Sequence, residues 1–167
     1  NAMERAIAHF QVEHWPTELA ADCITLAFDE RHRRRIRLST DGGEDILLDL
    51  PKAIAMAHGD GLRISDGRWM AVRAAPEPLL EIRCQTPLAL LRTAWHLGNR
   101  HLPTDVTADR LRIRPDHVIE AMLRGMGAQV EHITAPFQPE GGAYDGQDGG
   151  HAHSHSYDHD HDHNHEH

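Results

Sequence analysis

Short apolar runs follow one another through the first half of the chain, and their length and spacing predict strands rather than helices. The runs cover residues 6–12, 21–28, 35–38, 46–48 and 69–73. Turn-forming glycine sequences separate them at residues 41–43, 58–61 and 66–67. We therefore expect a small all-β domain over residues 3–75.

The pattern changes after residues 75–78, where two prolines within four residues predict an extended connector between two domains. A strand is expected at residues 79–84. A helix should follow it, with Thr86 as the N-cap and Pro87 at the first helical position. Apolar residues recur at helical spacing as one stripe along this helix, formed by Leu88, Leu91 and Trp95.

Gly98 is expected to close this helix, because glycine is the residue most common just past a helix end. Asp116 is placed to cap a second helix that ends near residues 125–127. Further short strands are expected at residues 104–107, 110–114 and 128–134. The order strand, helix, strand, strand, helix, strand is that of a ferredoxin-like domain, here over residues 79–135. The predicted fold class is α+β.

Periodicity ends beyond Pro136, and residues 140–167 consist largely of Gly, Asp and His. Such a segment buries too little apolar surface to offset its ordering entropy, so we expect a disordered tail in the absence of a ligand. All 17 Lys and Arg precede residue 125, as do 18 of the 26 acidic residues, so the charge of −9 belongs mainly to the end of the chain. A nearly neutral body with an acidic extension argues against nucleic acid as a partner.

Eight of the 16 histidines lie in the tail, where they alternate with Asp, Ser, Asn and Glu. They are His151, His153, His155, His159, His161, His163, His165 and His167. Imidazole suits nickel, copper and zinc, and a flexible chain can bend several rings around one ion. Copper outcompetes nickel and zinc at most nitrogen sites, so affinity alone does not identify the metal. Since imidazole is mostly protonated near pH 5, acid should release the ion.

A purification tag is the alternative explanation of this segment, although tags are usually uninterrupted histidine runs.

His117 lies in the first turn of the second predicted helix, on its polar side with Glu120, Ala121 and Arg124. We expect Val118, Ile119, Met122, Leu123 and Met126 to form the apolar side. The positive end of the helix dipole favours a neutral imidazole, which can bind a metal. One histidine cannot make a site, but two copies across a symmetric dimer could. An exposed histidine that is merely solvated is the simpler interpretation.

Other histidines and the basic cluster have more ordinary interpretations. His96 and His101 flank a helix end, where they can bind the last carbonyls, and His132 on the last strand is a weak ligand candidate. The arginine-rich residues 31–37 are expected to form the solvated face of a strand, or to dock an acidic protein.

Several classes of protein are excluded by missing patterns. No HExxH, GxSxG or Walker sequence is present, so we expect no enzyme. No apolar run approaches the roughly 20 residues of a membrane span. Cys23 and Cys84 form no CxxC pair, and no secretory signal is visible, so we expect a cytoplasmic protein.

Three sequence motifs together resemble the UreE family of urease accessory proteins. They are Trp95-His-Leu-Gly-Asn-Arg-His-Leu-Pro103, Asp116-His-Val-Ile-Glu-Ala-Met-Leu-Arg-Gly125 and Ala135-Pro-Phe-Gln-Pro-Glu-Gly-Gly-Ala-Tyr144. Residues 33–38 and 59–62 also agree, and the resemblance covers nearly the whole chain. Trp95 departs from the family, which commonly has Tyr there.

The resemblance implies a homodimer that binds Ni²⁺ and delivers it to urease, together with the accessory GTPase and the urease maturation complex. It also implies a peptide-binding-like β domain followed by a ferredoxin-like domain that dimerises. His117 matches the metal ligand that both subunits of the family supply, and the tail histidines match its variable metal-binding end. Zn²⁺ or Cu²⁺ can also bind such a tail.

Other functions give different expectations. A histidine-rich nickel or zinc store needs only the tail, whereas a chaperone that mainly docks protein depends on the β domain. A metallohydrolase would need a general base, and none is visible at a suitable spacing.

Overall fold

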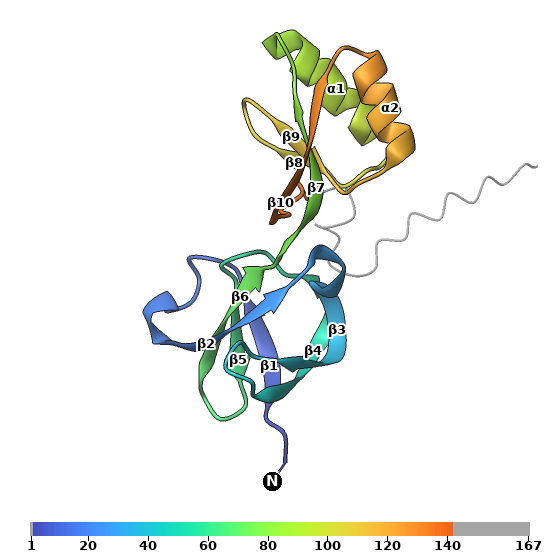
Figure 1. The fold of residues 1–167 in the computed structure, drawn as a ribbon. Coiled ribbons are helices and arrows are strands. Elements are labelled where there is room, and N and C mark those ends of the chain that lie inside the picture. Colours follow the sequence, from blue (N-terminus) through green and yellow to red (C-terminus); the bar gives the residue numbers. More distant parts are fainter. Residues whose placement is uncertain (1, 142–167) are drawn as a thin grey trace, which may run out of the picture.

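The computed structural model describes residues 2–141, which form two domains, each with its own sheet and hydrophobic core (Figure 1). The first sheet has six strands in the order β2-β6-β5-β1-β4-β3. Its strands are β1 (Arg5–Phe10), β2 (Ala20–Leu26), β3 (His32–Ser39), β4 (Asp45–Ala55), β5 (Gly61–Ile64) and β6 (Trp69–Ala74). Short 3-10 turns, η1 (Thr17–Leu19) and η2 (Phe28–Glu30), precede β2 and β3. The all-β prediction for this half is confirmed.

Alternating burial explains why these segments pair as strands. Along β4 the side chains of Ile46, Leu48 and Leu50 are buried, and the residues between them are more exposed. Side chains of a strand point alternately to its two faces, so one face of β4 enters the core. The core of this domain also contains Ile24 and Met70 from other strands.

Two strands differ from the prediction. Strand β5 was not predicted, because its four residues follow directly on a glycine turn and give no periodic signal. Strand β4 runs on to Ala55, through Pro51, and the pairing with β3 is irregular between Arg33 and Arg35. The predicted turns are present, and Gly43 and Gly67 adopt φ of 93° and 96°, which glycine tolerates best.

The second sheet has the order β10-β7-β9-β8, and all its described pairings are antiparallel. Its elements are β7 (Pro76–Arg83), α1 (Pro87–Asn99), β8 (Asp105–Val106), β9 (Leu111–Ile113), α2 (His117–Gly125) and β10 (Gln129–Pro136). Both helices lie on one side of this sheet (Figure 1), and Leu97, Ile119 and Leu123 pack there against strand residues such as Ile82. The predicted ferredoxin-like order is confirmed.

The predicted connector is not separate from the strand that follows it. Strand β7 begins at Pro76, and it pairs with β10 at Pro76↔Pro136 and Pro78↔Thr134. Pairing with β9 begins only at Leu80. At Pro76 and Pro78, one side of β7 therefore has no neighbouring strand among the described residues. Proline, which has no backbone N–H, is tolerated at such edge positions.

Helix α1 begins as predicted and ends later than predicted. The Thr86 Oγ1 accepts a hydrogen bond from the Ala89 amide at 3.1 Å, which confirms the N-cap. Gly98 lies inside the helix, and the left-handed residue after its end is His101, with φ of 58°. The Leu102 amide closes the end by donating to the Leu97 carbonyl.

The apolar stripe of α1 faces solvent in the described chain. Leu88, Leu91 and Trp95 are 54%, 66% and 64% exposed. The helix packs on the core through its opposite side, which contains Leu90, Thr93, Ala94 and Leu97. Likewise, Val118 in α2 and Met126 just after it are exposed, so the predicted apolar side of this helix is only partly buried in the described chain. No helix among residues 2–141 is long and apolar enough to cross a membrane.

Candidate metal centre

His117 is the first residue of α2, and its position follows from the cap before it. One Asp116 carboxylate oxygen, Oδ1, accepts hydrogen bonds from the amides of Val118 and Ile119 at 2.9 and 3.0 Å. The cap satisfies two amides that would otherwise have no partner at the helix start, so α2 begins here. His117 is exposed, as its position on the helix predicted.

A charged group lies one turn further along the same side of α2. The Glu120 carboxylate contacts the Arg124 guanidinium at 3.0 Å and Nε2 of His132, from β10, at 2.9 Å. These contacts, with Arg124 the stronger, hold the pKa of Glu120 below its ordinary value. His132 is therefore already engaged by a carboxylate on the neighbouring helix, and its ring faces solvent.

The described chain does not complete a metal site by itself. Among residues 2–141, no three His, Cys, Asp or Glu side chains are grouped so that they could hold an ion. His117 therefore needs ligands from the tail or from a second chain to form a site. The predicted ligands His151, His153, His155, His159, His161, His163, His165 and His167 lie outside the described residues.

Exposed apolar side chains lie on both helices of the second domain, and one of them, Val118, is next to His117 in sequence. We call this surface, formed by Leu88, Leu91, Trp95 and Val118, the helical face. Val118 is 63% exposed and directly follows His117. Large contiguous apolar surfaces on a folded domain usually mark an interaction site. The sequence signalled this surface as a periodic stripe but did not show that it faces outward.

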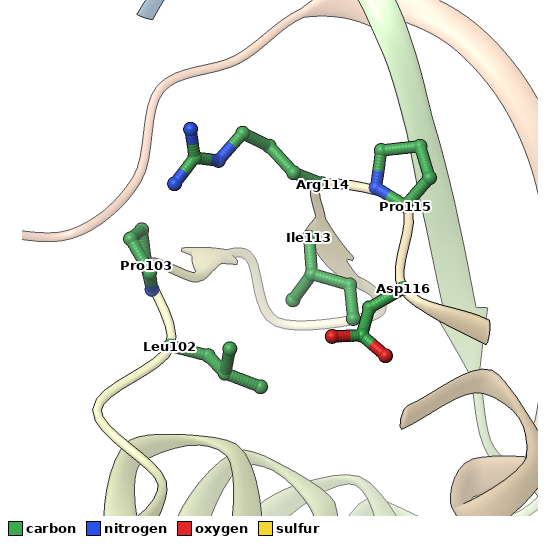
Figure 2. Close-up of a pocket in the computed structure, with 6 residues that line it drawn as sticks. All are labelled: Leu102, Pro103, Ile113, Arg114, Pro115 and Asp116. Carbon is green, nitrogen blue, oxygen red and sulfur yellow. The ribbon is translucent and has the colours of Figure 1, made fainter. Parts of the chain in front are cut away.

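A hollow of about 320 Å³ lies immediately before α2 (Figure 2). Leu102 and Pro103 form one side of it, and the strand end with Ile113, Arg114 and Asp116 forms the other, as Figure 2 shows. The Asp116 that caps α2 thus also lines the hollow. The residue after it is His117, so the hollow adjoins the candidate ligand.

The hollow borders the seam between the two domains. The Arg114 guanidinium contacts the Asp29 carboxylate of the first domain at 2.7 Å and lies 4.9 Å from the centre of the Phe28 ring. The Phe28 ring in turn meets the ring of Phe137 edge to face at 5.2 Å. The two domains are therefore joined by aromatic and charged contacts beyond strand β7.

Arg31 and Phe137 form the buried centre of this seam. Phe137 is fully buried and Arg31 is 3% exposed. The Arg31 guanidinium donates to the carbonyls of Leu26 and Met56, at 3.0 and 3.2 Å, and to that of Phe137. Burial lowers the pKa of Arg31, and the charge of Glu77 opposes that shift. No local sequence pattern indicates this seam, because its residues come from distant parts of the chain.

The segment after Phe137 is held by both domains. The Gln138 side-chain oxygen accepts from the His58 backbone amide at 3.2 Å, and the Gln138 backbone amide donates to the Asp105 carboxylate at 3.2 Å. The Glu140 amide donates to the Thr104 carbonyl at 2.8 Å. Thr104 directly follows Pro103 of the hollow. The chain therefore leaves the described structure at the seam, beside the hollow that precedes His117.

The remaining predicted candidates have ordinary surroundings. The His96 ring lies edge to face with Trp95 at 5.1 Å, and His101 is exposed beyond the helix end. Neither joins a group of ligands among the described residues. Cys23 and Cys84 are both free thiols.

Comparison with known proteins matches both halves of the chain. Residues 3–75 match the model of the UreE urease accessory protein N-terminal domain, and residues 77–167 match that of its C-terminal domain. A urease accessory protein UreE of Bradyrhizobium sp. strain BTAi1 is 58% identical over 132 residues, which are 79% of this chain and 64% of that protein.

More distant relatives give the same result over more of their length. The urease accessory protein UreE of Chelativorans sp. strain BNC1 is 56% identical over 75% of this chain and 79% of its own length. The urease accessory protein UreE of Beijerinckia indica is 50% identical over 80% of this chain and 78% of its own length. Against the Bradyrhizobium relatives, the matched part of this chain spans somewhat less than two thirds of their length.

Proposed function

Since this chain belongs to the UreE family of urease accessory proteins, we propose that it is a nickel metallochaperone for assembly of the urease active site. In this proposal a homodimer holds Ni²⁺ between its two His117 side chains, and the histidines of the tail complete the coordination. The chain carries the ion and transforms no substrate. The observation that carries the proposal is His117, exposed at a helix start beside the exposed Val118 and without further ligands in its own described chain.

The helical face supports a dimer that brings two His117 side chains together. Leu88, Leu91 and Trp95 are more than half exposed, although side chains of this size gain most when buried. A symmetric dimer places the same surface on both sides of its interface, so any residue near the axis meets its own copy. His117 adjoins Val118 of this face and would be duplicated in the same way.

The origin of the tail supports its participation. Residues 142–167 begin next to Glu140, which is bonded to Thr104 at the edge of the hollow. A flexible chain of 26 residues has a root-mean-square span of about 25 to 30 Å. That span is comparable to the width of one small domain, so tail imidazoles could reach α2 from this origin.

The ion and the recipients follow from the family. Urease assembly makes nickel the expected cargo, while imidazole ligands also accept Zn²⁺ or Cu²⁺. The recipients proposed are the urease accessory GTPase and the urease maturation complex, within the cytoplasm. Delivery requires ligands that leave readily, and an exposed histidine pair with open positions meets this requirement better than a closed four-ligand site.

Nickel titration by calorimetry, with light scattering for mass, tests the proposal. The variants are the full chain, a chain ending at Gly150, and that shorter chain with His117→Ala. We expect about one tight site per dimer in the shorter chain and its loss with His117→Ala. His14→Ala, at another exposed histidine on the first domain, is the matched control and should bind as the unsubstituted chain does.

Two outcomes contradict the proposal. If the shorter chain binds no nickel, the tail is the metal site, and the protein is a histidine-rich nickel or zinc store. If His14→Ala and His117→Ala weaken binding equally, the ion is not held at α2.

A further inference from the structure

The basic edge of the six-stranded sheet has no role in the function proposed above. Strand β3 is the last strand of that sheet, so one side of its backbone has no partner strand among residues 2–141. Its exposed side chains include Arg33, Arg34, Arg35 and Arg37. Charged residues on an edge strand prevent uncontrolled pairing, but a strand with charges of one sign also selects a partner of the opposite sign.

The carboxylates around β3 do not neutralise this charge. Asp49 lies 3.4 Å from Arg35 and 3.3 Å from Arg5, so one carboxylate serves two guanidinium groups. Arg37 contacts Asp45 at 2.6 Å. Arg33 has no ion pair or hydrogen bond to any described side chain. The edge therefore keeps an excess of positive charge facing solvent.

The opposite edge of the same sheet provides an internal comparison. Strand β2 is the other edge, and its seven residues contain one acidic side chain, Asp22, and no basic one. Both strands end the sheet order, but at β2 the Cys23 carbonyl already accepts from the Asp41 amide at 2.8 Å, and only β3 carries positive charge. An acidic ligand would therefore prefer β3.

The end of the described chain is tied to the start of β3. Arg31, which donates to the Phe137 carbonyl, is the residue immediately before His32, the first residue of β3. The segment that follows, residues 142–167, contains six acidic side chains and no Lys or Arg. An eight-residue strand is about 26 Å long at roughly 3.3 Å per residue, which a flexible 26-residue chain can cover from this origin.

We propose that the metal-free acidic tail, residues 142–167, docks along the arginine-rich edge strand β3 of its own chain, and that metal binding to the tail releases it. Charge complementarity and the anchored origin favour this segment over a separate acidic partner. Each divalent ion cancels two of the six negative charges, so the metal-loaded tail is attracted less strongly to β3. The ion also gathers the histidines around itself, which shortens the stretch of tail that can lie along β3. The released strand then becomes available to an acidic partner only after loading.

The test is paramagnetic relaxation in the full chain, with Cys23→Ser, Cys84→Ser and a nitroxide on Ser156→Cys. In metal-free solution at low salt, amide signals of Arg33–Arg37 should be broadened, and those of β2 should not. About 1 M salt, where the Debye length is about 3 Å, should abolish the broadening. Arg33→Gln with Arg35→Gln should abolish it too, while Arg73→Gln with Arg83→Gln, the same charge change on β6 and β7, should leave it.

Equal broadening at both edges, or broadening that survives Arg33→Gln with Arg35→Gln, overturns the docking. A mixture of nitroxide-bearing chains and isotope-labelled chains without nitroxide shows whose tail is bound. Full broadening in that mixture assigns the contact to a second copy and overturns docking within one chain. If no sample shows broadening, the tail does not dock on β3 and the proposal is overturned. A separate acidic protein would then be the remaining partner for β3.

Release by metal rests on the proposed metal-binding tail and is tested separately with saturating Zn²⁺, which is diamagnetic. We expect the β3 signals to recover. Broadening that persists although calorimetry shows zinc bound overturns the coupling and leaves the metallochaperone role intact. Because docking is measured without metal, its failure is distinguishable from a failure of metal binding.

Discussion

The seam between the domains and the helical face use similar side chains in opposite ways. At the seam, Phe137 is fully buried and Phe28 packs against its ring, within one chain. On the helical face, Leu91 and Trp95 are about two thirds exposed. The first surface is completed within a single chain, whereas residues 2–141 leave the second exposed. Apolar residues alone therefore do not tell which surface a chain keeps for itself and which it offers to another.

Polar groups account for the difference between the two surfaces. The seam combines its rings with a buried arginine, and each of the three nitrogens of that side chain donates to a backbone carbonyl. No buried polar side-chain atom is left without a partner among the described residues. The helical face carries His117 at its border, with no ligand partner in its own described chain. A closed polar network holds two domains in place, whereas the ligand positions of His117 stay open to groups from outside the described residues, as the proposed function requires.

The largest effect is expected from breaking the seam. Phe137→Ala removes a fully buried ring and should lower the free energy of unfolding by about 3 to 5 kcal/mol, measured by chemical denaturation of the full chain. Phe10→Ala is the control: the Phe10 ring is 36% exposed and packs edge to face on Trp69, so this variant should lose less free energy of unfolding. Equal losses for the two variants would show that the seam is not specially stabilising.

The next effect is expected at the helical face. Leu91→Ala with Trp95→Ala should weaken the proposed dimer by about 2 kcal/mol or more, which is about thirtyfold in its dissociation constant. Sedimentation over a range of concentrations measures this, and circular dichroism should be unchanged because both side chains face solvent. Leu19→Ala, at a leucine 60% exposed on the first domain, should leave the dimer intact. If the double variant dimerises as tightly as the unsubstituted chain, the dimer interface does not lie on the helical face.

A smaller and more selective effect is expected at the helix caps. Asp116→Ala and Thr86→Ala each remove one cap, and each should lower the free energy of unfolding by about 1 kcal/mol. Only Asp116→Ala loosens the turn that carries His117, so only this variant should also weaken nickel binding in calorimetry. A matching loss of nickel affinity in Thr86→Ala would mean that general destabilisation, not the position of His117, controls binding.

The smallest effect is expected from the outer ion pair of the seam. The Asp29 carboxylate is 76% exposed and the Arg114 side chain is 40% exposed. Exposed pairs contribute little, so Asp29→Asn should change the free energy of unfolding by less than about 0.5 kcal/mol. A thermal melt that falls as far as that of Phe137→Ala would show that charge, rather than burial, joins the domains.

Local chemistry made much of this fold predictable. Thr86 and Asp116 act through hydrogen bonds that reach only two or three residues, so their roles could be predicted from neighbouring residues alone. The end of α1 could not, because the carbonyl of Leu97 finds its donor at Leu102 and places the left-handed turn at His101 rather than at a glycine. Boundaries that depend on how the chain leaves a helix need the packing that follows.

Local sequence patterns did not predict which side of a helix packs on the sheet or which distant residues come into contact. Helix α1 has apolar residues on two sides, and periodicity does not decide whether Leu91 or Leu97 packs on the sheet. The bond between Arg31 and Phe137 joins residues 106 positions apart, so no local signal points to it. The exposure of His117 was predicted correctly, while the tail ligands lie outside the described residues and stay a prediction.

The anchoring of Phe137 and Gln138 also affects the local concentration of the tail histidines near the seam. A binding group on a short flexible tether meets nearby sites at an effective concentration in the millimolar range, which falls roughly as the −3/2 power of tether length. Because the chain is tied down as far as Glu140, the residues that follow start from the seam and not from the end of β10. Under the proposed function, an ion that leaves one imidazole of the tail therefore meets a high local density of further ligands, and recapture competes with escape until a recipient surface approaches.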